Sequence, residues 1–294
     1  MPERLRGVIP PLVTPFTRED EVDEGALRTI VRFLKPHVHG LFVCGTYGGG
    51  PLMNIAERQR VLEVVAEEAG LDLTLTVQVG TTNLRDSLAL ARHAARCGVA
   101  LVASVPPYYY GHPEREVVYF YQRLVEGAGL PVYVYNNPKA VGYAIAPDLL
   151  RKLVGLGVRG IKDSSFDIMV LANFLRKTRD LPCDVVLGTE AMFTAAAALG
   201  IQAFIPGLGN PFPELCRALY EAAMAGDYHK ARGIQETVNA VRDVMYEAGS
   251  TLVAVFAMLQ IRGVCHAFPR PPFLPLEAAG VESMRQRLAA LGVL

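Results

Sequence analysis

The sequence predicts an α/β fold, a (β/α)8 or TIM barrel with a C-terminal helical extension. Eight short apolar runs, rich in strand-forming residues, alternate with helical patterns of roughly ten to sixteen residues, and such alternation is typical of parallel sheets. Eight strand–helix units are the number that closes into a barrel. After the eighth unit the sequence becomes purely helical. The apolar runs cover residues 7–15, 40–43, 73–79, 100–105, 132–135, 158–162, 184–187 and 202–205.

The segments between these runs carry the signals that begin and end helices. Asp23 and Asn54 precede the first two helical segments, and their side chains are suited to cap helix N-termini. Gly70 ends the second of these helices. Its apolar residues recur at helical spacing, at Ile55, Leu62, Val65 and Ala66. Prolines, which the first turn of a helix tolerates, stand near the expected starts of three later helices, at Pro113, Pro147 and Pro213.

A doubly wound open sheet is the main alternative to the barrel. Such sheets usually carry a Gly-rich fingerprint after the first strand. Here that position reads PPLVTPF over residues 10–16, which lacks the glycines that a bound dinucleotide requires. The barrel is therefore favoured.

The chain from Asp227 to Leu294 reads as three helices. The breaks between them are Gly249-Ser250 and an extended, proline-rich stretch at 268–275. Because no flexible linker precedes this part, we expect it to pack on the barrel. The predicted organisation is a catalytic barrel at 1–226 and a helical extension at 227–294.

The composition disfavours several classes of protein. Lys and Arg total 29, as do Asp and Glu, so no charged surface for nucleic acid or an anionic membrane is indicated. The N-terminus has no apolar signal-peptide stretch, and the most apolar later segment, 252–261, is too short to span a bilayer. The five cysteines are odd in number and never form a C-x-x-C pair. We expect free thiols, Cys44 among them as a small buried side chain, and a cytoplasmic location.

Metal and serine-hydrolase chemistry are also disfavoured. His37 and His39 are the only histidines at ligand-like spacing, and they precede the second strand, at the end of the barrel away from the expected site. No G-x-S-x-G motif is present. We therefore expect neither a metal ion nor a bound organic cofactor.

Lys162 is the most informative candidate residue. It ends the apolar run at 158–162 in a chain that has six lysines and twenty-three arginines. A lysine among apolar walls can lose its proton, and its free amine can then attack a carbonyl group. Tyr135 ends the preceding strand, although a tyrosine there could equally be an aromatic side chain with a hydrogen-bonded tip. Amine and phenol on neighbouring strand ends are the groups that Schiff-base carbon–carbon chemistry needs.

Further polar residues follow other strands, as expected for a barrel active site. Thr46 and Tyr47 follow the second strand, residues 108–110 are three tyrosines after the fourth, and Gly188 and Pro206 lie after the seventh and eighth. The tyrosines could also be a rim element or an oligomer contact. The glycines at 48–50 lack the Lys-Ser/Thr of a P-loop, so a turn that presents N–H groups to a carboxylate is favoured over a phosphate site.

These motifs together resemble the pyruvate-dependent class I aldolases of the dihydrodipicolinate synthase and N-acetylneuraminate lyase superfamily. The resemblance spans nearly the whole chain. Within the superfamily, GGGP at 48–51 and FPRPPFLP at 268–275 look most like archaeal-type 2-keto-3-deoxygluconate aldolases. The resemblance to the superfamily rests on the motifs GVIPPLVTPF at 7–16, GTYG at 45–48, PYY at 107–109, YNNP at 135–138 and GIKDS at 160–164.

The resemblance implies a role for each matching residue. Lys162 would form a covalent imine with pyruvate, and Tyr135 would transfer protons. Thr46 would hold the substrate carboxylate and relay protons, helped by the backbone N–H of Tyr47. Tyr109 matches a tyrosine lent to a neighbouring subunit, which implies a homotetramer built as a dimer of dimers. The remaining implied contacts to the substrate, direct or through the backbone, are Gly48, Ser164, Gly188, Pro206, Asn137, His112 and Lys139.

Departures from the family pattern bear on the substrate. Ala140 stands where dihydrodipicolinate synthases carry an arginine for the aldehyde's carboxylate, so lysine biosynthesis is disfavoured. His112 and Asn137 replace an arginine and a tyrosine of aldolases that accept phosphorylated substrates. Tyr47 replaces the usual Thr or Ser, which either breaks the proton relay or narrows the pocket.

The predicted function is reversible cleavage of a 2-keto-3-deoxy sugar acid to pyruvate and a small aldehyde. One alternative is a sugar-acid dehydratase, in which the same imine expels water. Dihydrodipicolinate synthase and N-acetylneuraminate lyase activities, or an aromatic aldehyde partner, are further alternatives. A barrel that only binds a keto acid is disfavoured, because a binder has no need of an imine-forming amine.

Overall fold

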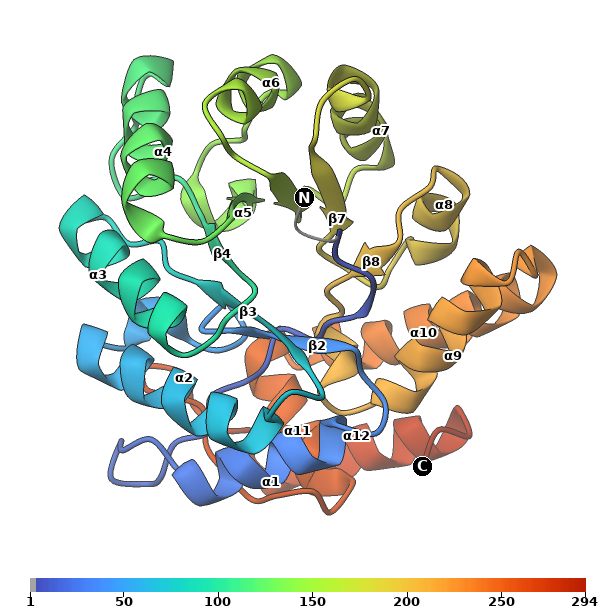
Figure 1. The fold of residues 1–294 in the computed structure, drawn as a ribbon. Coiled ribbons are helices and arrows are strands. Elements are labelled where there is room, and N and C mark those ends of the chain that lie inside the picture. The colour runs from blue at the N-terminus through green and yellow to red at the C-terminus, as the bar shows by residue number, and fades with distance from the viewer. Residues whose placement is uncertain (1–3) are drawn as a thin grey trace.

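A computed structural model describes residues 4–294 and has the predicted barrel architecture (Figure 1). Eight parallel strands lie at the centre and the helices surround them. The strands are β1 (Gly7–Val8), β2 (Gly40–Val43), β3 (Thr74–Gln78), β4 (Leu101–Ser104), β5 (Val132–Asn136), β6 (Gly160–Asp163), β7 (Asp184–Leu187) and β8 (Ala203–Phe204). The (β/α)8 fold class is confirmed.

The helices between the strands begin where the sequence signals place them. Asp23 caps α1 by accepting a hydrogen bond from the N–H of Ala26, and Asn54 caps α2 through a reciprocal capping box with Glu57. The barrel helices are α1 (Glu24–Leu34), α2 (Ile55–Ala69), α3 (Leu84–Arg96), α4 (Glu114–Ala128), α6 (Pro147–Gly155), α7 (Ile168–Thr178), α8 (Phe193–Ala198) and α9 (Pro213–Met224). Three short elements lie in loops after strands: η1 (Gly50–Leu52), α5 (Pro138–Val141) and η2 (Gly207–Gly209).

The first strand is much shorter than the predicted run at 7–15. Pro10 and Pro11 have no N–H group to donate to a ladder, so regular pairing with β8 stops at Val8. The chain nevertheless continues beside β2: the N–H of Phe42 donates to the Pro10 carbonyl, and the N–H of Leu12 donates to Phe42. Together with the bond from the N–H of His39 to the Val8 carbonyl, these two bonds join the first segment to β2 and close the barrel.

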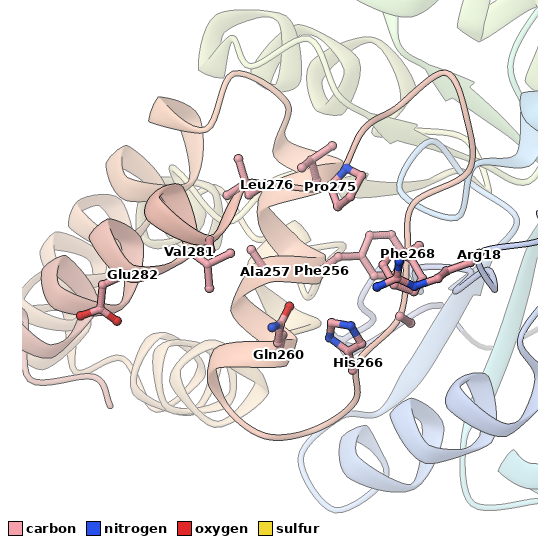
Figure 2. A pocket seen from close by; sticks show the side chains of 13 residues that line it. Arg18, Phe256, Ala257, Gln260, His266, Phe268, Pro275, Leu276, Val281 and Glu282 are labelled. Carbon is pink, nitrogen blue, oxygen red and sulfur yellow. The ribbon is translucent and has the colours of Figure 1, made fainter.

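Three helices follow the barrel, as predicted: α10 (Tyr228–Glu247), α11 (Thr251–Ile261) and α12 (Ala278–Ala290). Helix α10 packs on α8 and α9, and α11 packs on α10 and α12. The extended stretch between α11 and α12 is fastened to the barrel by two backbone hydrogen bonds between Phe16 and Phe268. A groove of about 460 Å³ lies between α11, α12 and this stretch, and Figure 2 shows the side chains that line it.

No described helix is by itself both long enough and apolar enough to cross a membrane, and α10 and α11 meet that test only as a pair bent by 110°.

Asn210 fastens the loop after β8 to the segment that closes the barrel. Its side chain is fully buried. The amide oxygen accepts the N–H of Val13, and the amide nitrogen donates to the carbonyls of Pro11 and Gly207 at 3.0 and 3.1 Å. One side chain thus satisfies three backbone groups that water does not reach.

We expect Asn210→Ala to lower the free energy of unfolding by about 2–4 kcal/mol, because it leaves the buried Val13 N–H and Pro11 carbonyl without the partners that Asn210 gives them, while the Gly207 carbonyl keeps only the backbone N–H of residue 210. Urea unfolding followed by circular dichroism measures the change. Asn173→Ala, on the outer helix α7, is the control and should stay within about 0.5 kcal/mol of the wild type. Equal stability of the two variants would contradict the role given to Asn210.

Candidate active site

A cavity of about 500 Å³ opens at the C-terminal ends of the strands, where barrel enzymes place their active sites. Eight of the predicted site residues line it: Lys162, Tyr135, Thr46, Tyr47, Asn137, Lys139, Ser164 and Gly188. The other lining residues are Pro11, Ala140, Phe166, Ile205, Tyr246, Gly249, Ser250, Thr251 and Phe273. The groove in Figure 2 is separate, and none of the predicted site residues lines it.

Lys162 lies on β6 at the floor of this cavity and is only 3% exposed. Its Nζ atom is 3.9 Å from the centroid of the Phe42 ring and 3.9 Å from that of Tyr135. Within residues 4–294 no carboxylate forms an ion pair with it. Burial lowers the pKa of the Lys162 amine below its ordinary value of 10.5, because an apolar environment disfavours the ammonium form.

Tyr135 is held beside Lys162 by strand register, since the two residues are direct partners in the β5–β6 pair. Its hydroxyl lies 3.2 Å from the Thr46 hydroxyl, and the Asn137 amide nitrogen donates to both oxygens. Burial acts to raise the pKa of Tyr135, but the Lys162 ammonium and hydrogen bonds from neighbouring groups outweigh it and lower the pKa. An amine and an acidified phenol therefore face one cavity.

The carboxylate next to Lys162 does not face the cavity. Asp163 is fully buried and accepts hydrogen bonds from the Asn136 amide and from the N–H and hydroxyl of Ser165. Asn136 in turn accepts the N–H of Ile145. These bonds fasten the ends of β5 and β6 together, and so fix the relative positions of the residues just before them.

Ser164 and Gly188 meet at the ends of β6 and β7. The Ser164 hydroxyl donates to the Gly188 carbonyl, and the N–H of Gly188 donates to the backbone carbonyl of Asp163. A Cβ atom at position 188 would lie 2.0 Å from the Ser164 oxygen, so only glycine allows this approach.

Tyr47 narrows the cavity and takes no part in the Tyr135–Thr46 contact. Its hydroxyl turns toward Gly207, where a Cβ atom would lie 2.5 Å away, and toward Thr251. Burial, with Glu190 close by, raises the pKa of the Tyr47 hydroxyl far above its usual range, which makes it unsuited to proton transfer near neutrality. Of the two effects considered from sequence, the structure favours the narrower pocket.

Four predicted site residues do not line the cavity of this chain. Gly48 packs under the Leu12 carbonyl, and Pro206 precedes η2. The ring of His112 pairs with Glu116 on α4. Tyr109 is 85% exposed, with a left-handed φ of 79°, and its implied contact with another subunit stays a prediction.

Sequence reasoning missed the side of the cavity formed by the C-terminal extension. Tyr246 comes from α10, Ser250 and Thr251 from the start of α11, and Phe273 from the following stretch. Phe166 follows β6 and, with φ of 61°, is held in the left-handed region. The strand-end rule could have indicated Phe166, whereas the helical residues carried no signal. Within the described chain no three His, Cys, Asp or Glu side chains form a group that could hold a metal ion.

Comparisons with known proteins place almost the whole chain in one family of sequences. The sequence model described as the dihydrodipicolinate synthetase family matches residues 4–291. N-acetylneuraminate lyase of Rhizobium meliloti (strain 1021) is 32% identical over 287 residues, which are 97% of this chain and 95% of the relative.

Two solved structures show the same fold over nearly their whole length. A variant of the Sulfolobus solfataricus 2-keto-3-deoxygluconate aldolase has a TM-score of 0.91 at 25% identity, and 97% of this chain and 96% of that one are covered. A catalytic lysine mutant of the Ruminococcus gnavus sialic acid aldolase also has a TM-score of 0.91, at 26% identity, with 98% and 96% covered.

The lowered pKa of Lys162 can be measured directly. After reductive methylation with ¹³C-formaldehyde, we expect the Lys162 resonance to titrate at lower pH than those of the other five lysines, because only Lys162 is buried. Heteronuclear NMR between pH 6 and 11 records the curves, and Lys162→Arg identifies the resonance by its loss. The assignment fails if all six lysines titrate together.

Proposed function

Because this chain belongs to the dihydrodipicolinate synthetase family, we propose that it is a class I aldolase acting on pyruvate through an imine on Lys162. The observation that carries the proposal is the buried Lys162 amine with the Tyr135 phenol beside it. Members of this superfamily are lyases of the aldolase type, and a lyase is the class of enzyme to which the chain belongs. The substrate, the imine and the roles below are proposals.

Imine formation begins with the neutral amine of Lys162. Its nitrogen attacks the keto carbon and forms a C–N bond, which gives a carbinolamine. Tyr135 donates its proton to the carbinolamine hydroxyl, which leaves as water and gives a protonated imine and a phenolate. The lowered pKa of Lys162 supports the first step. In the second step the positive charge that forms on the same nitrogen favours the Tyr135 phenolate, as the Lys162 ammonium does when it lowers the pKa of Tyr135.

Cleavage then uses the protonated imine as an electron sink. The phenolate of Tyr135 takes the proton of the substrate's C4 hydroxyl, the C3–C4 bond breaks, and the aldehyde leaves. The bonding electrons form an enamine, which takes a proton at C3 from the Tyr135 hydroxyl and becomes a protonated imine again. Water then adds to this imine and returns a proton to the Tyr135 phenolate, the C–N bond breaks, and pyruvate and the free amine are released. Every proton that Tyr135 gives in the first stage is thus recovered in the second.

The pyruvate carboxylate has a suitable place in the loop after β2. Among the described residues no acceptor takes the backbone N–H groups of Thr46 and Tyr47, and the Thr46 hydroxyl lies in the same loop. Adjacent free N–H groups form a favourable site for an anion. This arrangement supports binding of a 2-keto acid with its carboxylate in the loop and its keto carbon at Lys162.

We propose a 2-keto-3-deoxy sugar acid as the substrate. The hydroxyl and amide groups that line the cavity support it, as does similarity to the 2-keto-3-deoxygluconate aldolase structure. No arginine is among the lining residues of the described chain, and Ala140 lies where a carboxylate clamp would be needed. A second carboxylate on the aldehyde, as in lysine biosynthesis, is therefore not part of the proposal.

The proposal also covers the cofactor requirement, the location and the oligomeric state of the enzyme. Chemistry through Lys162 requires no metal ion or organic cofactor. The five cysteines are free, in keeping with a reducing cytoplasm. The exposed Tyr109 supports a homotetramer in which this side chain reaches a neighbouring site.

Borohydride trapping tests the imine. With pyruvate and sodium borohydride we expect a carboxyethyl group on Lys162, located by peptide mass spectrometry, because only its amine is both buried and adjacent to Tyr135. Lys162→Arg, which keeps a cation but cannot form the imine, should carry no adduct.

Lys139, the other lysine at the cavity, is an internal control. An adduct there in place of Lys162, or no adduct at all, would overturn the proposal. Product analysis then separates aldol cleavage, which yields pyruvate and an aldehyde, from dehydration, which yields water and keeps the carbon chain whole.

Removal of one hydroxyl tests the proton transfer. We expect Tyr135→Phe to lower kcat by about 10²–10⁴, the usual cost of losing an acid–base group. Steady-state kinetics of pyruvate release measures it. Tyr133→Phe is the matched control in the same strand, because that hydroxyl bonds to Asp184 and does not line the cavity. A Tyr135→Phe enzyme with near wild-type kcat would remove Tyr135 from the mechanism.

A further inference from the structure

The turn between α10 and α11 presents hydroxyl groups to the cavity. Tyr246, Ser250 and Thr251 all line it. They belong to the C-terminal extension and not to the strands or the loops directly after them. None of these three residues takes part in the imine and aldol steps proposed above.

The Tyr246 hydroxyl is oriented by Arg242, one turn earlier on α10. The guanidinium donates to the Tyr246 oxygen at 2.9 Å, and its central carbon lies 5.1 Å from the Tyr246 ring centroid. Arginine has only donors, so the phenol oxygen must accept in this bond. Within residues 4–294 no acceptor takes the Tyr246 hydrogen, which is therefore available to a ligand in the cavity.

Arg242 itself is not free to bind a ligand. It is 8% exposed and forms an ion pair with Glu190, which is 1% exposed and also accepts the N–H of Gly207. A second bond joins Arg242 to the Thr189 hydroxyl. With its charge neutralised and its position fixed by β7 and β8 loops, Arg242 serves as a rigid support for Tyr246.

Ser250 adds a second unused hydroxyl. It stands at the N-cap of α11, a position where serine normally accepts a backbone N–H of the first turn, but here its side chain makes no capping bond. Phe166 and Phe273 also line the cavity, with exposed rings, and the Phe166 ring centroid lies 5.8 Å from the central carbon of the Arg242 guanidinium. A ligand in this part of the cavity therefore meets both hydroxyl groups and apolar rings.

We propose that Tyr246 and Ser250 form a subsite for the hydroxyl groups of the aldehyde half of the substrate, with Tyr246 donating to a hydroxyl oxygen. This inference rests on the proposed Schiff-base function and deepens it by assigning aldehyde selectivity to the C-terminal extension. Arg242 is the positioning residue of the subsite. The ligand class is a short polyhydroxylated aldehyde.

The test compares two aldehydes of equal length in the aldol addition with pyruvate: glyceraldehyde, which carries hydroxyls, and propanal, which does not. We expect Tyr246→Phe to lower kcat/KM for glyceraldehyde about threefold to tenfold, the range for one lost hydrogen bond, and to leave propanal within about twofold. Ser250→Ala should act in the same direction, and the double variant should lose more than either single one.

Tyr228→Phe is the control, because Tyr228 lies on the same helix with 43% exposure against 44% for Tyr246 and does not line the cavity. Equal loss for both aldehydes, no loss for either, or a wild-type preference for propanal would overturn the subsite. Borohydride trapping of pyruvate on Lys162 is measured in every variant and in the wild type. Its absence in the wild type marks failure of the proposed function, whereas intact trapping with unchanged selectivity marks failure of the subsite alone.

Discussion

Burial of one amine is the constraint on which this site depends. Lys162 lies between two aromatic rings with its Nζ 3.9 Å from each centroid, and no carboxylate of the described chain pairs with it. An ammonium in such surroundings is poorly solvated, so burial shifts the equilibrium toward the neutral amine, the form that the proposed imine chemistry needs. The cost in stability is tolerable because the amine stays next to a cavity and a phenol, and does not lie in the closed core.

The Lys162 amine can act together with Tyr135 only if the two side chains keep their relative positions. The β5–β6 register places Tyr135 opposite Lys162, and the next pair along, Asn136 and Asp163, is joined by a buried side-chain hydrogen bond of 2.7 Å. This bond fixes the relative position of the two strand ends, whereas burial lowers the pKa of the Lys162 amine. A carboxylate directly after the lysine is thus prevented from pairing with it, because its oxygens are occupied by Asn136 and Ser165.

Much of this arrangement could be predicted from the sequence, since parallel strands bring their C-terminal ends to one face of a barrel. Lys162, Tyr135 and Thr46 were found by that rule. The rule is silent on Tyr246, which reaches the cavity from a helix beyond the barrel. The direction of the Tyr47 ring depends on the absence of a side chain at Gly207, far along the chain. Likewise β1 is short because of Pro10 and Pro11, although the pattern of apolar residues there continues to Pro15.

The division between barrel and extension also separates two tasks of the site. Groups proposed to make and break bonds stand on strands and the loops directly after them, where hydrogen-bonded register limits movement. Groups proposed to choose the aldehyde stand on a helix turn, and Arg242 and Glu190 are among the side chains that join this part of the chain to the barrel. Substitutions at the turn can therefore change which aldehyde fits without disturbing the amine. The pair Arg242–Glu190, which supports Tyr246 on one side and the Gly207 N–H on the other, is one contact through which a change in the extension would reach the barrel. The bonds from Gln235 on α10 to Thr194 and to the Glu190 carbonyl are others.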